Sequence, residues 1–349
     1  MAIILGTIAV LFAFSQVFAH SEKKDKIYLC IVWLLLVFIT AFRSIDFYID
    51  TKGYEDFYEN FSKMSVKLRY YSLFVAKEKD PMYHFLSGTL GSFGLSFRGW
   101  LVVVSIIYYT GFIYALNRFS QVPFLTALGL ICMSYVFFTM TGIRQTIAMG
   151  FCFFAFVKAY DRKFIPFLIF VGLGYLFHSS CLIFILAYFL INRKFGMIQV
   201  LLLVTSLMIA FLFPTAINQI VKTLAWSDDM QKYAETSTGL SIFGYAVQLG
   251  IAAICLVLQR EYCLKDKEGI ALLNMVVLGL LFQIFAIRID NIFRMSMYFS
   301  VYGMFMLANV VSKFEDDKNY WWAYLLVCGV FLAYMLRAGA YADFSLFGG

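Results

Sequence analysis

The chain has 349 residues, of which 62% are hydrophobic and only 14% are charged, and its formal net charge is +7 at pH 7. A soluble domain averages about 45–50% apolar and about 25% charged residues, so this composition excludes a soluble protein and indicates an integral membrane protein. The basic residues lie in short connections and not in one basic stretch with interleaved aromatics. We therefore expect no nucleic-acid partner.

The apolar runs are continuous and long, which predicts transmembrane helices. Basic residues follow the first run instead of preceding it, so we expect a retained first helix with its N-terminus outside. The predicted fold is an all-α, polytopic membrane helical bundle of about twelve transmembrane helices in one integral membrane domain, residues 1–349. The expected helices lie near residues 1–19, 27–42, 99–117, 121–140, 142–160, 164–177, 179–191, 196–213, 241–258, 269–287, 292–311 and 320–337.

The segment from Asp80 to Leu95 decides the predicted topology. Asp80 is expected to cap a helix with Pro81 at its first position, and one face of this helix is apolar. With about 14 residues the helix is too short to span a bilayer, so we expect it to lie along the interface within an extracytoplasmic loop, residues 43–98. The later basic connections then all fall on the cytoplasmic side.

With this topology most chemically capable residues face the periplasm or the cell exterior. They occur in the 43–80 segment, the Thr141–Gln145 turn, the His178 turn, the extracytoplasmic loop 214–240 and the Arg288–Asp290 connection. The seven cysteines are scattered without metal-ligand spacing, so neither a disulfide framework nor a metal site is expected.

Asp46 and Asp50 lie where the second predicted helix leaves the membrane. A carboxylate at the edge of a low-dielectric cavity gains basicity and can accept the proton of a sugar hydroxyl. The alternative is that both are solvated loop acids. Their spacing alone does not decide between the two.

Arg144 and Gln145 begin a helix at membrane depth, directly after Gly142 and Ile143. An arginine in this position costs about 2.5–3.5 kcal/mol on insertion scales, so it is expected to face an interior cavity and to have a partner. Near a helix N-terminus it suits a diphosphate, although snorkelling to the interface is the alternative. His178 either polarises a phosphate or hydroxyl, or is a hydrogen-bonded packing residue.

A second charged group contains Arg288, Asp290 and Arg294. Asp290 and Arg294 stand four residues apart, so a structural ion pair is one interpretation and phosphate binding by an unpaired arginine is the other. The 214–240 loop is a candidate contact for an acceptor sugar, although interfacial anchoring explains its aromatic residues equally well. The loop residues concerned are Trp226, Asp228, Asp229, Tyr233 and Glu235.

Several of these elements occur in the same order in a known family. They are Arg43, Asp50-Thr51-x-x-Tyr54, Asp80-Pro81, Gly142-Ile143-Arg144-Gln145-x-Ile147-Ala148 and Phe177-His178-Ser179-Ser180. Over about residues 1–310 the chain resembles the EpsG family of exopolysaccharide proteins, which is grouped with Wzy-type polysaccharide polymerases. It departs from the family pattern at Ile49, where Gly is usual, and at Asp80, where Glu is commoner. An aspartate loop followed by a flat helix also resembles the GT-C glycosyltransferase fold.

The resemblance implies a glycosyltransferase, a polysaccharide polymerase of the bacterial inner membrane. It would join polyprenyl-diphosphate-linked repeat units of an O-antigen, capsule or exopolysaccharide at the outer face. Asp50, or else Asp46, is then the base, and Arg144, with Arg288 or Arg294, stabilises the charge that develops on the leaving diphosphate. The expected substrate-binding residues are Arg43, Tyr54, Gln145, His178, Arg288 and Arg294.

The glycosyl-diphosphate bond supplies the energy of such a reaction, so no cofactor is expected. The expected partners are polyprenyl-diphosphate-linked oligosaccharides and membrane lipid, with a chain-length regulator and a flippase as further candidates. A single-sugar GT-C transferase would use the same residues. A flippase should show an internal repeat and charges near the bilayer midplane, and a membrane O-acyltransferase should have its site near a cytoplasmic acyl donor.

Overall fold

The computed structural model describes residues 1–18, 22–47, 49–71, 80–212, 242–287, 292–314 and 319–347. They belong to two compact units, one made of Met1–Leu182 with Asp317–Gly349 and the other of Ile183–Asp316. Within the described ranges the regular structure is helical, apart from one isolated antiparallel bridge between Arg43 and Leu346. The predicted all-α class is confirmed.

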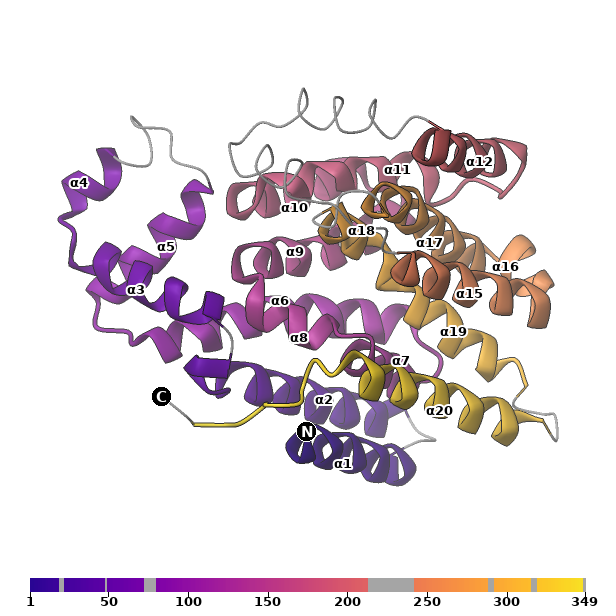
Figure 1. Ribbon diagram of the computed structural model, residues 1–349, viewed down its shortest axis with the longest axis horizontal. Coiled ribbons are helices and arrows are strands. Elements are labelled where there is room, and N and C mark those ends of the chain that lie inside the picture. The colour runs from indigo at the N-terminus through magenta and orange to yellow at the C-terminus, as the bar shows by residue number, and fades with distance from the viewer. Residues whose placement is uncertain are drawn as a thin grey trace. The chain divides into compact units, whose positions relative to one another are not determined.

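Five helices of the first unit lie side by side in chain order, each in contact with the next (Figure 1). They are α1 (Ala2–Phe18), α2 (Glu22–Ala41), α6 (Phe97–Phe119), α9 (Ile143–Tyr160) and α10 (Phe164–Phe177). α6 and α9 approach closely at two glycines, since a Cβ at Gly111 would lie 2.1 Å from the carbonyl oxygen of Gly150. Small residues permit this close backbone contact between apolar helices.

Between α6 and α9 the chain forms a broken helix. α7 (Pro123–Cys132) and α8 (Tyr135–Thr141) are bent by 52° relative to each other. Ser134, at the break, has a φ of 64°, a left-handed conformation that cannot continue a right-handed helix. α7 also contacts the last helix, α20 (Tyr320–Ala338). The continuous helix expected near residues 121–140 is therefore two helices.

The segment that was expected to be a polar loop is largely helical. α3 (Ile49–Lys63) is followed by the short α4 (Val66–Tyr70), and α3 packs on α5 (Pro81–Ser92). Although the composition of α3 is polar, its sequence is amphipathic, since aromatic side chains recur at helical spacing along one face. These side chains are Tyr54, Phe57, Tyr58 and Phe61. This spacing explains why the segment is helical.

α5 buries Tyr83 together with polar and small side chains, and leaves part of its apolar surface exposed. His84 and Ser87 are buried, whereas Phe85 is 41% and Phe93 84% exposed. The two ends of the segment 43–98 lie close together, because Arg98 Nη1 at the start of α6 donates to the main-chain oxygen of Arg43 at 3.0 Å. This return is what a helix lying along the interface requires, although its placement on a membrane surface stays a prediction.

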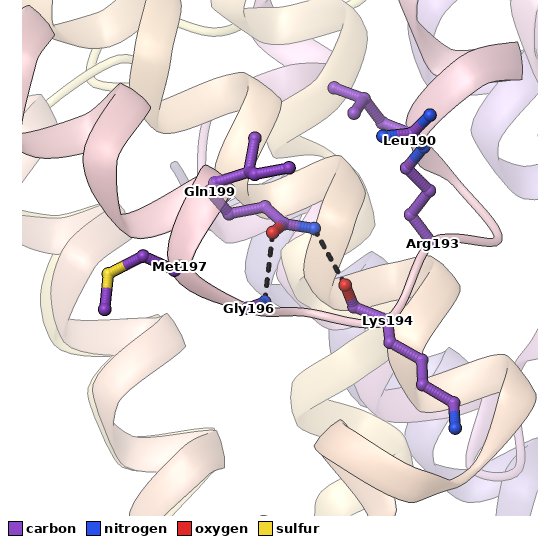
Figure 2. A pocket seen from close by; sticks show the side chains of 7 residues that line it. Leu190, Arg193, Lys194, Gly196, Met197 and Gln199 are labelled. Carbon is purple, nitrogen blue, oxygen red and sulfur yellow. Dashed lines mark hydrogen bonds between the residues drawn. The ribbon is translucent and has the colours of Figure 1, made fainter.

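In the second unit α17 (Lys267–Ala286) is the central helix, and most of its side chains are buried. The helices in contact with it are α11 (Ile185–Leu190), α12 (Met197–Leu212), α15 (Phe243–Leu258), α16 (Arg260–Lys265), α18 (Phe293–Ser300) and α19 (Tyr302–Ser312). A hollow of about 290 Å³ lies where α11 leads into α12, and Gln199 Nε2 supports this turn by donating to the main-chain oxygen of Lys194 at 3.1 Å (Figure 2).

Each apolar segment expected to be helical contains a helix in the described ranges. By length and composition four described helices are able to cross a membrane, or five if the bent pair α7 and α8 is one span. The others are shorter apolar helices. The protein is thus a helical membrane protein, and the count of about twelve spans stays a prediction.

Candidate active site

Asp80 is the centre of a charged cluster in the first unit. It directly precedes α5, where its φ of 57° is a left-handed conformation that aspartate tolerates better than most residues. Pro81 occupies the start of the helix as predicted, but the Asp80 side chain makes no capping hydrogen bond. Asp80 thus occupies the predicted N-cap position, but its side chain does not cap the helix: the carboxylate instead binds Arg144 and His178.

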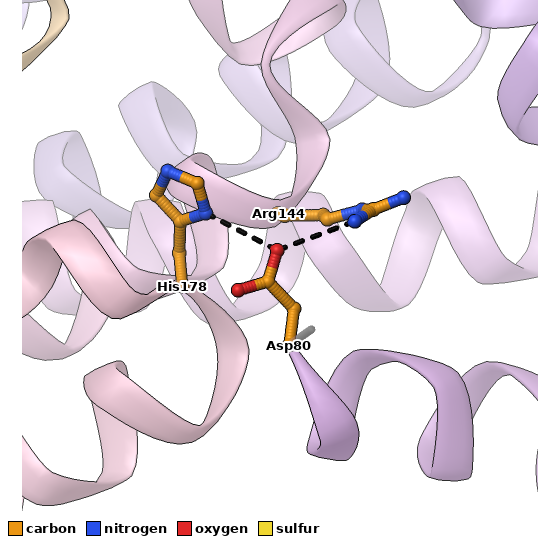
Figure 3. A network of polar contacts seen from close by, with 3 residues as sticks. All are labelled: Asp80, Arg144 and His178. Atoms are coloured by element: carbon orange, nitrogen blue, oxygen red, sulfur yellow. Dashed lines mark hydrogen bonds and ion pairs between the residues drawn. The ribbon is translucent and has the colours of Figure 1, made fainter. Parts of the chain in front are cut away.

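The same carboxylate oxygen binds both partners. Asp80 Oδ2 lies 3.3 Å from Arg144 Nη1 and 3.3 Å from His178 Nδ1, so the carboxylate bridges the two side chains (Figure 3). The Asp80 side chain is 1% exposed, against 28% for Arg144 and 23% for His178. The second oxygen, Oδ1, is buried and has no hydrogen-bond partner in the part of the chain that the structure describes.

The protonation of Asp80 follows from these partners. Burial raises the pKa of the Asp80 carboxyl, but the hydrogen bond and charge of His178, with those of Arg144, outweigh burial, so the pKa lies below its ordinary value. A carboxylate with a lowered pKa is ionised at neutral pH and accepts a proton poorly. Asp80 is therefore suited to holding Arg144 and His178 in place, and less suited to acting as a general base.

Arg144 lies close to two tyrosine rings. Its guanidinium carbon is 5.3 Å from the ring centre of Tyr83 and 5.9 Å from that of Tyr54, distances at which a cation is attracted to an aromatic face. Arg144 is the second residue of α9, so the first N–H groups of that helix, which have no partner within it, lie nearby. A guanidinium beside a helix N-terminus is an arrangement that binds phosphate groups.

A buried aromatic and aliphatic cluster supports these side chains. It draws on α3, α5, α6, α9 and α10, and the partly exposed ring of Tyr54 packs against it. Its buried members are Tyr58, Tyr83, Phe97, Trp100, Leu101, Val104, Ile143, Ile147 and Phe177. Close packing of this kind restricts the movement of the charged groups at its edge.

The two candidate acids lie on neighbouring elements of the same unit. Asp46 is exposed in a 3-10 turn, Ile45–Phe47, and Asp50 is exposed in the first turn of α3. Tyr54 follows Asp50 by four residues, so Asp50 lies one turn earlier on the helix face that meets Arg144. Gln145 is buried in α9. Of the sequence-predicted residues, Tyr54, Arg144 and His178 are brought together around Asp80.

Arg43 is enclosed by the protein. Its guanidinium donates to the main-chain oxygens of Thr40 at 2.6 Å and Met140 at 2.7 Å, and the residue is only 1% exposed. Burial lowers the pKa of Arg43 to about 9, which leaves the guanidinium charged at pH 7. Its enclosure favours a structural role, joining the end of α2 to the end of α8, over the direct substrate contact that the sequence suggested.

Some expected site residues have no described place in this cluster. Arg294 is exposed on α18 in the second unit, and Arg288, Asp290 and the loop 214–240 lie outside the described residues. Their roles stay predictions. Among the described residues no three His, Cys, Asp or Glu side chains are grouped so that they could hold a metal ion.

The sequence did not identify Asp80 as a site residue, although it contained an indirect signal. An arginine at membrane depth is expected to have a partner, and Arg144 was predicted to have one without its being named. Asp80 was assigned to helix capping because it precedes Pro81. Asp80 and Arg144 are 64 positions apart in the sequence, so no local pattern reveals that they pair.

The comparisons with known proteins supply the family. The profile of one family, described as the EpsG family, matches residues 26–346 and so covers nearly the whole chain. The protein belongs to the EpsG family. EpsG is a Wzy-type polymerase-like family, so the resemblance seen in the sequence is confirmed. No curated protein and no solved structure matches this EpsG-family chain significantly, and its GT-C-like architecture stays a prediction.

Proposed function

We propose that this EpsG-family protein is a polysaccharide polymerase that joins polyprenyl-diphosphate-linked repeat units at the outer face of a bacterial plasma membrane. The observation that carries the proposal is the bridging of Arg144 and His178 by Asp80 beside the N-terminus of α9. A partly exposed guanidinium at a helix N-terminus, with a histidine beside it, suits a diphosphate, which is the leaving group of such a polymerase.

The reaction forms one bond and breaks another. A hydroxyl oxygen of the incoming repeat unit attacks the anomeric carbon of the growing chain, whose bond to the diphosphate oxygen breaks. The hydroxyl proton passes to a carboxylate, for which Asp50, or else Asp46, is the candidate. Both are exposed, and Asp50 lies one helical turn before Tyr54, whose ring is near Arg144. The polyprenyl diphosphate leaves with the bonding electron pair.

Arg144 acts where negative charge develops. As the bond to the diphosphate breaks, charge accumulates on the phosphate oxygens, and a pre-oriented guanidinium stabilises it better than a mobile one. Asp80 and the rings of Tyr54 and Tyr83 orient Arg144, and Arg144 keeps donors beyond the one that binds Asp80. His178, held by the same carboxylate oxygen, orients a phosphate or hydroxyl group.

Replacement of Arg144 tests the proposal. Arg144→Ala should lower the rate of chain growth by about a hundredfold or more, because a donor aimed at developing charge is worth about 10²–10³ in rate. The measurement is the ladder of chain lengths formed by the purified protein in liposomes that contain polyprenyl-diphosphate-linked repeat units. The matched control is Arg260→Ala, since Arg260 is exposed on α16 and has no role in the cluster.

The form of the product separates the alternatives. A normal ladder from Arg144→Ala would contradict the role of Arg144. A wild-type protein that adds one sugar and stops would be a single-sugar transferase, and one that moves the lipid-linked unit across the bilayer without forming a bond would be a flippase.

A further inference from the structure

The helix α8 directly precedes Arg144 and is held at both of its ends. It has 7 residues, Tyr135–Thr141, and only Gly142 and Ile143 separate it from Arg144. A helix this short has little stability of its own, so its position depends on the packing of its buried side chains and on the contacts at its ends. Those contacts come from parts of the chain far away in the sequence.

Tyr341 holds the first end of α8. Its hydroxyl donates to the main-chain oxygen of Ile131 at 3.0 Å and accepts the N–H of Phe137 at 3.0 Å. Ile131 belongs to the last turn of α7 and Phe137 to the first turn of α8, so the hydroxyl bridges the break between them. Helix ends leave such groups without partners inside the helix, and Tyr341, which is fully buried, binds one from each helix. The Ile131 oxygen also accepts the N–H of Ser134 at 3.2 Å.

Tyr341 belongs to a C-terminal strap, residues 339–347, which pairs with the chain after α2. The N–H of Ser44 donates to the oxygen of Ser345 at 2.9 Å, and that of Phe347 donates to the oxygen of Phe42 at 3.0 Å. These bonds flank the bridge between Arg43 and Leu346. The strap therefore fixes the main chain from which the Arg43 side chain extends.

Arg43 and Thr51 hold the other end of α8. Both donate to the main-chain oxygen of Met140, Arg43 Nη2 at 2.7 Å and Thr51 Oγ1 at 3.5 Å. Thr51 follows Asp50 in α3, so this carbonyl links the start of α3 to the end of α8. The two ends of α8 are thus tied, through Tyr341 and Arg43, to one strap.

We propose that Tyr341 is a positioning residue that sets the place of Arg144 through α8. Its effect on the reaction rests on the proposed polymerase function, but its effect on the position of α9 does not. Without the hydroxyl, the ends of α7 and α8 at the break lose a shared partner, and α8 becomes free to shift together with the first turn of α9. The aromatic ring remains, so packing is kept.

The test compares Tyr341→Phe with Tyr175→Phe, which removes an exposed hydroxyl on α10 in the same unit. Hydrogen exchange of the purified wild type and both variants is measured at the amides of Phe137 and Thr146. The N–H of Thr146 donates to the main-chain oxygen of Gly142 at 2.8 Å, so it is protected at the junction of α8 and α9. We expect exchange to rise at both places in Tyr341→Phe only. The rate of chain growth should fall about tenfold, since small displacements of a catalytic group are costly.

A double replacement separates positioning from general stability. In the Arg144→Lys background the guanidinium that Tyr341 positions is already absent, so adding Tyr341→Phe should lower the residual rate less than twofold. Two changes that act through one group are not additive, whereas independent losses multiply. Equal fold losses in both backgrounds would overturn the proposal.

Exchange that stays unchanged at the amide of Thr146 in Tyr341→Phe would also overturn it, whatever the activity. If the wild type forms no polymer, the proposed function fails while the exchange measurement still decides the role of Tyr341. Thermal unfolding of both variants identifies a loss of fold. Should Tyr341→Phe unfold, Phe347→Pro should raise the same exchange, because proline lacks the N–H that the strap donates to Phe42. Unchanged exchange there would count against the proposal.

Discussion

At the scale of single residues, the site depends on one carboxylate. Asp80 is nearly inaccessible to solvent, whereas its two partners are partly exposed. Removal of one member of a buried ion pair leaves the opposite charge without a partner. The resulting loss of stability is larger than the net stabilisation that the intact pair provides. Asp80 therefore holds in place two side chains that reach the surface, although its own carboxylate is too buried to contact a substrate.

Asp80→Asn should lower the rate of chain growth about tenfold to a hundredfold, because the neutral amide no longer holds Arg144 by charge and a misplaced catalytic group is costly. Asparagine tolerates the left-handed backbone of this position, so the fold should be kept. Asp80→Glu keeps the charge and should retain more activity than Asp80→Asn. Ladder formation with matched protein amounts is the measurement, and equal activity of the two variants would argue against a charge-based role.

At the scale of elements, the position of Arg144 depends on how α9 packs against α6. The backbones meet at Gly111 and Gly150, where neither helix has room for a side chain. Arg144 lies at the N-terminal end of α9, so a change in the separation of the two helices moves its guanidinium relative to Asp80. Helix packing and site geometry are coupled in this way.

Gly111→Ala should destabilise the protein by about 1–3 kcal/mol, the usual cost of overpacking, because the new Cβ would meet the carbonyl oxygen of Gly150. The measurement is thermal unfolding in detergent, together with the rate of chain growth. Gly172→Ala on α10 is the matched control, since a Cβ there meets nothing within 4 Å. Its unfolding temperature should stay the same or rise slightly, and equal destabilisation of the two variants would refute the close contact.

At the scale of the whole molecule, hydrogen bonds between distant segments restrict the topology within the first unit. The chain after α2 is bonded both to Arg98, at the start of α6, and to the C-terminal strap after α20. Segments joined by direct hydrogen bonds lie on one side of a bilayer. The end of α2, the start of α6 and the strap should therefore all face the outside if any one of them does.

Cysteine labelling checks this arrangement. In a variant without the seven native cysteines, Gly53→Cys in α3 and Asp343→Cys in the strap should react with a membrane-impermeant maleimide on intact cells. Arg193→Cys, in a loop predicted to be cytoplasmic, should react only after permeabilisation. Different accessibility of positions 53 and 343 would contradict the shared side, and labelling of position 193 alone would reverse the predicted orientation.

The sequence by itself determined the membrane class, the helical segments and the break at His178, because apolar runs and their interruptions are local properties of a chain. It also indicated that Arg144 needs a partner. Only the tertiary structure decided that Asp80 is this partner, that Arg43 is enclosed and that Tyr341 bridges α7 and α8. These contacts join residues 64, 97 and 204 positions apart, and no local pattern encodes which distant groups meet when helices pack.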